Sequence, residues 1–302
     1  MGLEKKMLED GHDTSSSAEE EKNKNPLKNS FKGKIFQSGY NTISWVFIIL
    51  FLTVVLGMTL AVILSAFGTK WYATFLPEGF TIDWFVRAWE RYEVGQFFMV
   101  TMEIVLTATV ISLLLSIPTV YILARREFPF KQALISFFQL PFTLPDLLYA
   151  IPVASIFYSI GLAETIPGLI IVNLIVGIPF SIFILLPYME SLDPRLEYAA
   201  ESLGASKFKL FQRIIVPQII PGITTSAVNI FIRMFNTFTI ILLIAGPQTS
   251  TLNVMVFNVI RGSGSQPPAM LDSLALTLMI PLLLFAFLSL WVSSFTQRRL
   301  GK

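Results

Sequence analysis

The stretch "EYAAESLGASKFKLFQRIIVPQIIPG", from Glu197 to Gly222, carries five charged side chains between apolar runs that are long enough to cross a membrane. The whole chain is 54% hydrophobic and only 14% charged, with a mean hydropathy of +0.67. These values are too apolar for a soluble domain of this length. The sequence therefore predicts a membrane protein that contains one compact, charged loop.

Six segments have the roughly 20 mostly apolar residues that a helix needs to cross a bilayer. They are Ile43–Phe67, Phe98–Ala124, Ala133–Ile160, Ile166–Met189, Ile223–Ala245 and Leu271–Phe295. The predicted fold class is an all-α membrane protein with six transmembrane helices. The third segment contains "QLPFTLPDLLYAIP" (Gln139–Pro152), whose prolines free backbone carbonyls and so predict a kinked or broken helix.

The orientation follows from the distribution of lysine and arginine, which accumulate in cytoplasmic loops. With the N-terminus inside, 17 of these residues fall on the cytoplasmic side and four fall in the outer loops. Six spans then also place the C-terminus inside. We therefore expect an N-in/C-in topology with the Glu197–Gly222 stretch in the cytoplasm.

The regions outside the main apolar core divide into three parts. Residues 1–40 are polar and aperiodic, which predicts a disordered cytoplasmic tail, and the only histidine, His12, lies there. Residues 41–97 hold the first transmembrane helix and an outer loop with an aromatic amphipathic helix, which either anchors at the membrane interface or touches an external partner. Residues 296–302 form a basic cytoplasmic C-terminus.

Local rules predict two short helices in the charged loop. Asp193 suits an N-cap, Pro194 the first helical position, and Gly204 the left-handed residue that closes a helix from Pro194 to Leu203. Ser206 then caps a second helix, which Pro217 and Pro221 interrupt. The first helix has an apolar face of Leu196, Ala199, Ala200 and Leu203, and the second has a stripe of Phe208, Phe211 and Ile215.

The residues alone allow two interpretations of this loop. A connection between two spans needs only a few residues, so two capped helices with a small-residue face favour a docking element for a cytoplasmic partner. The alternative is that the loop simply packs beneath the membrane domain.

The segment "AAESLGASKFKLFQRIIVP", residues 199–217, resembles the EAA signature of the membrane permeases of binding-protein-dependent ABC importers. The resemblance implies the type I importer permease fold, with a core of five transmembrane helices over residues 98–295 and a cytoplasmic coupling loop over residues 190–222. It also implies that the 194–204 helix sits in a cleft of a separate ATPase subunit. The residues that it assigns to this coupling are Glu197, Tyr198, Ala199, Ala200, Leu203, Gly204, Ala205 and Pro217.

The segment departs from the family pattern at two places. Tyr198 stands where the family usually has the glutamate of the motif, and Val216 replaces a leucine. The first change questions the ion pair that the glutamate is expected to make with the ATPase. Glu197 or Glu201 is the expected substitute.

The resemblance implies several partners and a place in the cell. They are two ATPase subunits that bind ATP and Mg²⁺, a second permease that forms a homodimer or heterodimer with this chain, and an extracytoplasmic solute-binding protein. The expected location is a bacterial or archaeal cell membrane, which the chain crosses several times, and the expected mechanism is alternating access.

The chain itself is not expected to be an enzyme or to hold a cofactor. The segment "RGSGSQPP" (Arg261–Pro268) has glycines but lacks the lysine of a phosphate-binding loop. The absence of cysteine excludes a disulfide framework and thiolate metal sites. Without a histidine outside the tail there is also no nucleophile–base pair of the usual kind.

Polar residues inside the spans are the candidates for a solute path. Asp146 lies in the third segment, and Arg233, Asn236 and Thr237 lie in the fifth. Charges at such depth usually face the interior of a bundle. Arg233 either pairs with Asp146, extends its charge toward the surface, or lines the path.

The sequence leaves the solute and two further functional classes open. An organic anion such as a phosphonate, a polyamine, ferric iron and a sugar are all compatible solutes. The other classes are a self-contained ion-coupled secondary carrier and a purely structural membrane subunit.

Overall fold

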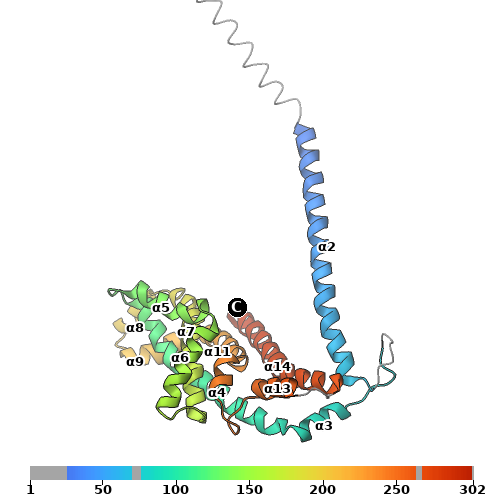
Figure 1. Cartoon of the computed structure of the whole chain (residues 1–302). Coiled ribbons are helices and arrows are strands. Elements are labelled where there is room, and N and C mark those ends of the chain that lie inside the picture. The colour runs from blue at the N-terminus through green and yellow to red at the C-terminus, as the bar shows by residue number, and fades with distance from the viewer. Residues whose placement is uncertain (1–25, 70–75, 263–266, 301–302) are drawn as a thin grey trace, which may run out of the picture. The chain divides into compact units, whose positions relative to one another are not determined.

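The computed structural model describes residues 26–69, 76–262 and 267–300, and in these ranges the chain is helical apart from its loops and one isolated bridge between Gly68 and Phe80 (Figure 1). The helices are α2 (Pro26–Phe67), α3 (Asp83–Arg91), α4 (Val94–Arg125), α5 (Lys131–Thr143), α6 (Asp146–Ser159), α7 (Ile166–Glu190), α8 (Arg195–Ser202), α9 (Lys207–Leu210), the π-helical turn η1 (Phe211–Ile215), α10 (Val216–Gln218), α11 (Ile220–Phe235), α12 (Thr239–Ile244), α13 (Leu252–Gly262) and α14 (Pro268–Leu300).

The chain divides into two compact units, residues 1–62 and 63–302. The first consists mainly of α2, whose apolar side chains from Ile43 to Leu60 are largely exposed. Residues 1–25 of the expected tail, including His12, lie outside the described residues. From Pro26 onward the backbone is helical, which differs from the disorder expected up to residue 40. Adding residues to a helix that has already formed costs less free energy than starting one, and proline suits the first turn of a helix.

Among the described residues, four helices are long and apolar enough to cross a membrane: Ile43–Phe67, Val94–Arg125, Ile166–Glu190 and Pro268–Leu288. Two bent pairs raise the number to six if each pair is one span. The first pair is α5 and α6, which meet at 98°. The second pair joins residues 207–218 to α11 at 70°. An all-α membrane protein, as the sequence predicts, is confirmed.

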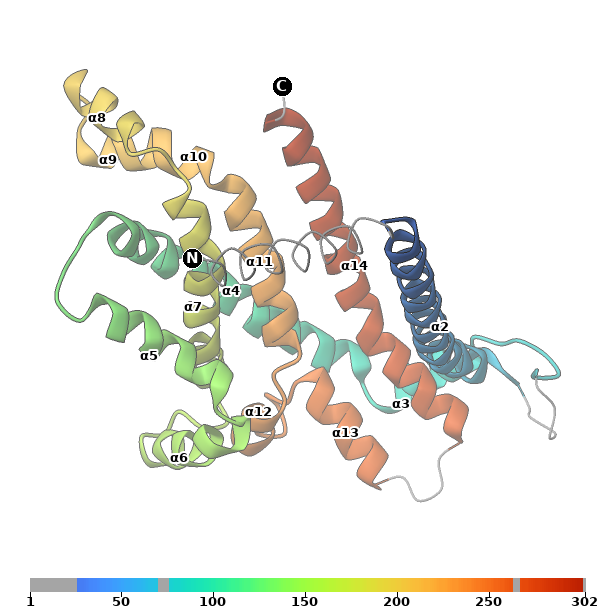
Figure 2. The ribbon, with the colours of Figure 1, turned by 90° about the horizontal axis from the view of Figure 1, so that it is seen from above.

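The third predicted span is broken, as its prolines indicate. Helix α5 ends at Thr143, and Pro145 precedes the first residue of α6 with extended backbone angles. Pro145 lacks the N–H that would continue the helical ladder, and a proline disfavours the helical conformation in the residue before it. Figure 2 shows the resulting elbow between α5 and α6.

The core of the second unit lies where α4, α7 and α11 pack together. Small residues permit their close approach: a Cβ at Gly177 would lie 1.9 Å from Cε of Met234 and 2.6 Å from Oγ of Ser112. Ser116 donates a hydrogen bond to the carbonyl of Ile178 at 3.2 Å. Such small residues are typical of helix contacts inside membranes, where lipid supplies no hydrophobic drive for association.

The fifth predicted span, Ile223–Ala245, is not one helix. Helix α11 ends at Phe235 and α12 starts at Thr239. Asn236 and Thr237 donate side-chain hydrogen bonds to the carbonyls of Ile232 and Arg233, at 2.8 and 3.3 Å. Polar side chains of this kind offer the backbone local bonds that compete with a regular helix, which accounts for the break.

Candidate functional site: the coupling loop and the broken helices

Of the two caps predicted for the coupling loop, residues 190–222, that of Ser206 forms as expected, whereas the N-cap of α8 is Pro194, one residue later than predicted. Asp193 Oδ1 accepts a hydrogen bond from the backbone N–H of Arg195 at 2.9 Å, at the start of α8. Ser206 Oγ accepts one from the N–H of Lys209 at 3.4 Å, at the start of α9. Gly204 adopts a φ of +81° between them, a conformation that glycine reaches without strain. Local sequence alone therefore sets the shape of this turn.

The apolar face predicted for the first helix divides between two environments. Ala200 is buried at 6% exposure, in a cluster with Leu123 of α4 and Leu210 of α9. Leu196 and Leu203 are 45% and 89% exposed, and Ala199 is also exposed. Small size at Ala200 thus permits close packing, while the rest of the face is open.

Exposed apolar side chains of α8, its C-cap Leu203 and α9 form what we term the docking patch: Tyr198 (67% exposed), Ala199, Leu203 (89%) and Phe208 (73%). Of the predicted Phe208 stripe, only Ile215 is buried, and Phe211 is half-buried. In Figure 2, α8, α9 and α10 lie together at one end of the second unit, which we call the loop end. Gly204 is exposed there, Ala205 is half-buried and Pro217 is exposed.

Glu197 faces into the protein. Its Oε1 contacts Nε of Arg125 at 2.5 Å, and its Oε2 accepts a hydrogen bond from the hydroxyl of Tyr121 at 3.0 Å. Arg125 also donates to the carbonyl of Leu192 at 3.0 Å. Glu201 is exposed, so of the two glutamates expected to replace the motif carboxylate, Glu201 is the accessible one.

The structure does not join the two candidate charges of the solute path. Arg233 and Asp146 are not among the ion pairs that the described residues form. The guanidinium of Arg233 instead lies 5.9 Å from the ring centre of Phe142, near the end of α5. Asp146 accepts a hydrogen bond from the hydroxyl of Tyr149 at 3.0 Å. The pairing considered from the sequence is therefore replaced by a cation–π contact and a bond within α6.

Three exposed polar side chains form a stripe along α11 and its C-cap: Asn229 and Arg233 in the helix, and Asn236 directly after it. Their spacing of i, i+4 and i+7 places them on one helical face. Thr237, at the break, is half-buried. Asn229 was not among the path residues predicted from the sequence, although the same spacing could have identified it.

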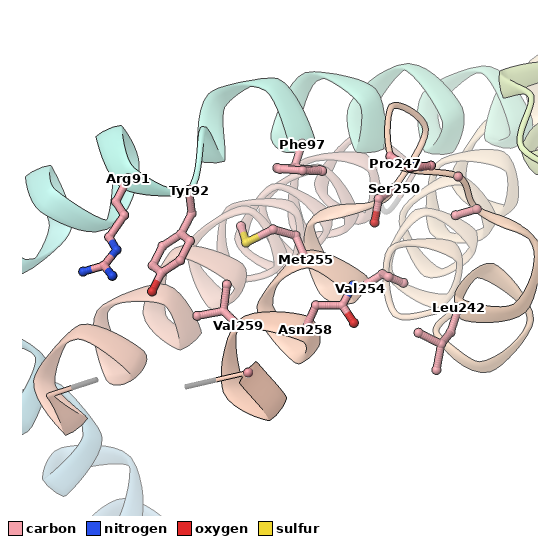
Figure 3. A pocket seen from close by; sticks show the side chains of 13 residues that line it. Arg91, Tyr92, Phe97, Leu242, Pro247, Ser250, Val254, Met255, Asn258 and Val259 are labelled. Atoms are coloured by element: carbon pink, nitrogen blue, oxygen red, sulfur yellow. The ribbon is translucent and has the colours of Figure 1, made fainter. Parts of the chain in front are cut away.

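An open cavity of about 800 Å³ lies at the end of the second unit opposite the loop end. Figure 3 shows Arg91, Tyr92 and Phe97 on one side of it and Ser250, Met255 and Asn258 on the other. Ser250 is only 8% exposed, and its hydroxyl has no hydrogen-bond partner among the described residues. The cavity joins residues far apart in sequence, so no local pattern indicates it.

No group of three or more histidine, cysteine, aspartate or glutamate residues gathers in the described part of the chain in a way that could hold a metal ion.

Comparison with known proteins identifies relatives along most of the chain. It is 28% identical over 203 residues to a diacetylchitobiose uptake system permease protein of Streptomyces coelicolor, a match covering 66% of this chain and 67% of the relative. It is 29% identical over 185 residues to a trehalose transport system permease protein of Mycobacterium tuberculosis, covering 61% and 68%. It is 28% identical over 196 residues to a sulfate transport system permease protein of Escherichia coli, covering 60% and 70%.

A solved structure shows the same fold. A chain of a bacterial ABC transporter involved in the import of the acidic polysaccharide alginate aligns with a TM-score of 0.69 at 14% identity, over 82% of this chain and 94% of the other. The family model described as "Binding-protein-dependent transport system inner membrane component" matches residues 108–302. This chain therefore belongs to the family of binding-protein-dependent transport system inner membrane components, and it is a multi-pass membrane permease subunit of an ABC importer in which separate subunits hydrolyse ATP.

Proposed function

We propose that the docking patch of Tyr198, Ala199, Leu203 and Phe208 is the surface on which an ATPase subunit binds. The observation that carries this proposal is the exposure of these apolar side chains on the two short helices of the coupling loop. Exposed apolar groups gathered at one place are typical of protein interaction sites. The loop end then faces the cytoplasm, in agreement with the distribution of basic residues.

Co-purification of the tagged chain from its own host in mild detergent tests this docking. We expect ATPase subunits with bound Mg²⁺ and ATP, a second permease, and loss of the ATPase when Leu203 becomes aspartate. Ile82→Asp is the matched control, because Ile82 is also apolar and 65% exposed but precedes α3, away from the loop end. Retention of the ATPase by the Leu203→Asp protein would reject this surface.

The polar stripe of α11 is the proposed solute path. Arg233 and two amides at one face suit a hydroxylated or anionic solute better than a polycation. Saccharide and sulfate permeases among the relatives agree with this class. The stripe is exposed in the single chain, so a second permease is needed to enclose it, because polar side chains are costly to expose to lipid.

Uptake into proteoliposomes that hold the complete importer tests the solute class. We expect trehalose, an oligosaccharide or sulfate to be transported and spermidine not to be. Transport of spermidine alone would exclude the proposed class. A self-contained ion-coupled carrier is not favoured by the family membership, and uptake that needs no ATP would be its signature.

The 800 Å³ cavity is the proposed vestibule into which a solute-binding protein delivers its cargo. A related alginate importer was solved together with its periplasmic protein. The cavity combines a guanidinium (Arg91), an aromatic ring (Tyr92) and an amide (Asn258), which are groups able to hold a hydroxylated solute. Asn258→Leu is expected to raise the solute concentration needed for half-maximal uptake, with ATPase docking unchanged.

A further inference from the structure

A buried polar contact fastens α8 to the end of α4. Arg125 and Glu197 have side-chain exposures of only 13% and 14%, and their atoms approach to 2.5 Å. Tyr121, one helical turn earlier on α4, donates its hydroxyl to the second carboxylate oxygen at 3.0 Å. Both oxygens of Glu197 are therefore taken by donors of this same chain.

This contact is unlike the other ion pair among the described residues. Lys131 and Glu127 are four residues apart, and the Glu127 side chain is 90% exposed. Arg125 and Glu197 instead join segments 72 residues apart. A charged hydrogen bond shielded from water is stronger than an exposed one, and losing one partner leaves the other charge uncompensated.

The same contact also reaches the second half of the coupling loop. The ring of Tyr121 lies edge-on to that of Phe211 in η1, with centroids 5.5 Å apart. The guanidinium of Arg125 donates a hydrogen bond to the carbonyl of Leu192, in the segment that leads into α8. The last two turns of α4 thus contact the loop before, within and after α8. Helix α4 in turn packs along α7 and against α11, the helix with the polar stripe.

We propose that Arg125 and Tyr121 are positioning residues that carry the movement of the ATPase-bound α8 into α4, and that Glu197 serves this internal link rather than an ion pair with the ATPase. The inference rests on the proposed docking of an ATPase at Leu203 and Phe208. The link consists of two hydrogen bonds to the buried Glu197 carboxylate, one from Arg125 and one from Tyr121. They join α8, which carries part of the docking patch, to α4 of the core. The accessible side chain beside Glu197 is Tyr198, so the interface is apolar and aromatic at the motif position.

The test uses the complete importer in proteoliposomes. Three quantities are measured: the amount of ATPase retained by the permease, the rate of ATP hydrolysis when solute-loaded binding protein is added, and the amount of solute transported per ATP hydrolysed. We expect Arg125→Met to retain the ATPase but to lower solute moved per ATP by between about twofold and thirtyfold, the range found for residues that modulate coupling between sites. Tyr121→Phe, which keeps the ring against Phe211, should have a smaller effect in the same direction.

Two further variants separate transmission from simple packing. The exchanged pair Arg125→Glu with Glu197→Arg should recover part of the lost transport per ATP. Lys131→Met, at the exposed ion pair of the same end, should behave as wild type.

Each contrary result has a definite meaning. Unchanged transport per ATP in Arg125→Met would overturn the inference, and so would loss of the ATPase in both Arg125→Met and Tyr121→Phe, because the contact would then serve docking. Failure of the wild-type chain to retain any ATPase would instead reject the proposed function itself.

Discussion

The side-chain amide of Asn253 donates a hydrogen bond to the backbone carbonyl of Phe235, with 2.5 Å between nitrogen and oxygen. Phe235 is the last residue of α11, so its carbonyl has lost the partner that a continuing helix would give it. Such a group needs another donor inside a membrane, where water is absent. Asn253, from α13, thus stabilises the break beside the polar stripe.

Replacing Asn253 with leucine should therefore destabilise the protein. The Phe235 carbonyl would be left unpaired, at a cost of about 1–3 kcal/mol. We expect a lower midpoint of thermal unfolding in detergent. Asn229→Leu is the control, because the Asn229 amide donates only to Thr225 within its own helix. Equal midpoints for the two variants would show that the Asn253 bond does not support the break.

A side chain at Gly177 should disturb the contact between α4, α7 and α11. Its Cβ would overlap Met234 and Ser112, so Gly177→Val should cost about 1–3 kcal/mol or more through overpacking. Gly57→Ala in α2 is the opposite case, since nothing lies within 4 Å of its Cβ and alanine favours a helix by roughly 0.5–1 kcal/mol. Thermal unfolding of both variants checks the sign, and a stabilised Gly177→Val protein would contradict the packing.

Backbone strain at Gly204 should weaken ATPase docking. A β-branched residue at a φ of +81° costs about 1–2 kcal/mol, although open space surrounds the position. Gly204→Val is expected to reduce the ATPase recovered with the tagged chain. Gly204→Asn, which tolerates this conformation, should lose much less. If valine and asparagine reduce the recovered ATPase equally, residue 204 must lack a side chain, and the left-handed turn is not the reason for its glycine.

Loss of the charge at Arg233 should impair transport without affecting docking. Removing a charged hydrogen-bonding group from a solute path is expected to lower uptake of an anionic or hydroxylated solute by roughly tenfold to a hundredfold. Arg233→Met keeps an apolar contact with Phe142, so the fold is expected to survive. Arg87→Met, on α3, is the control. Normal uptake by the Arg233→Met importer would remove this residue from the proposed path.

The local elements of the site follow from short stretches of sequence. Asp193, Gly204 and Ser206 each act on neighbours two or three residues away, so their caps and turn can be predicted from the order of residues alone. The prolines around Leu144 likewise indicate a break in the third span. The apolar composition predicts a helical membrane protein, because a backbone that crosses a bilayer can satisfy its hydrogen bonds in only a few ways.

The partners of the charged residues were decided only by the tertiary structure. Glu197 was expected to be available for the ATPase, but the fold brings it to Arg125, 72 residues away in sequence. Arg233 was a candidate partner for Asp146, but the structure places its guanidinium 5.9 Å from the ring centre of Phe142 instead. The break after Phe235 depends in part on Asn253, from a different helix.

The sequence by itself thus determined the membrane class, the two short helices of the coupling loop, the Ser206 cap and the left-handed glycine. Only the tertiary structure decided which face of α8 is buried, which carboxylate stays accessible, and which distant residue stabilises the break in the fifth span. The physical reason is the separation along the chain of the residues that interact. Caps and turns form between near neighbours, whereas burial and ion pairing depend on which distant helices pack side by side.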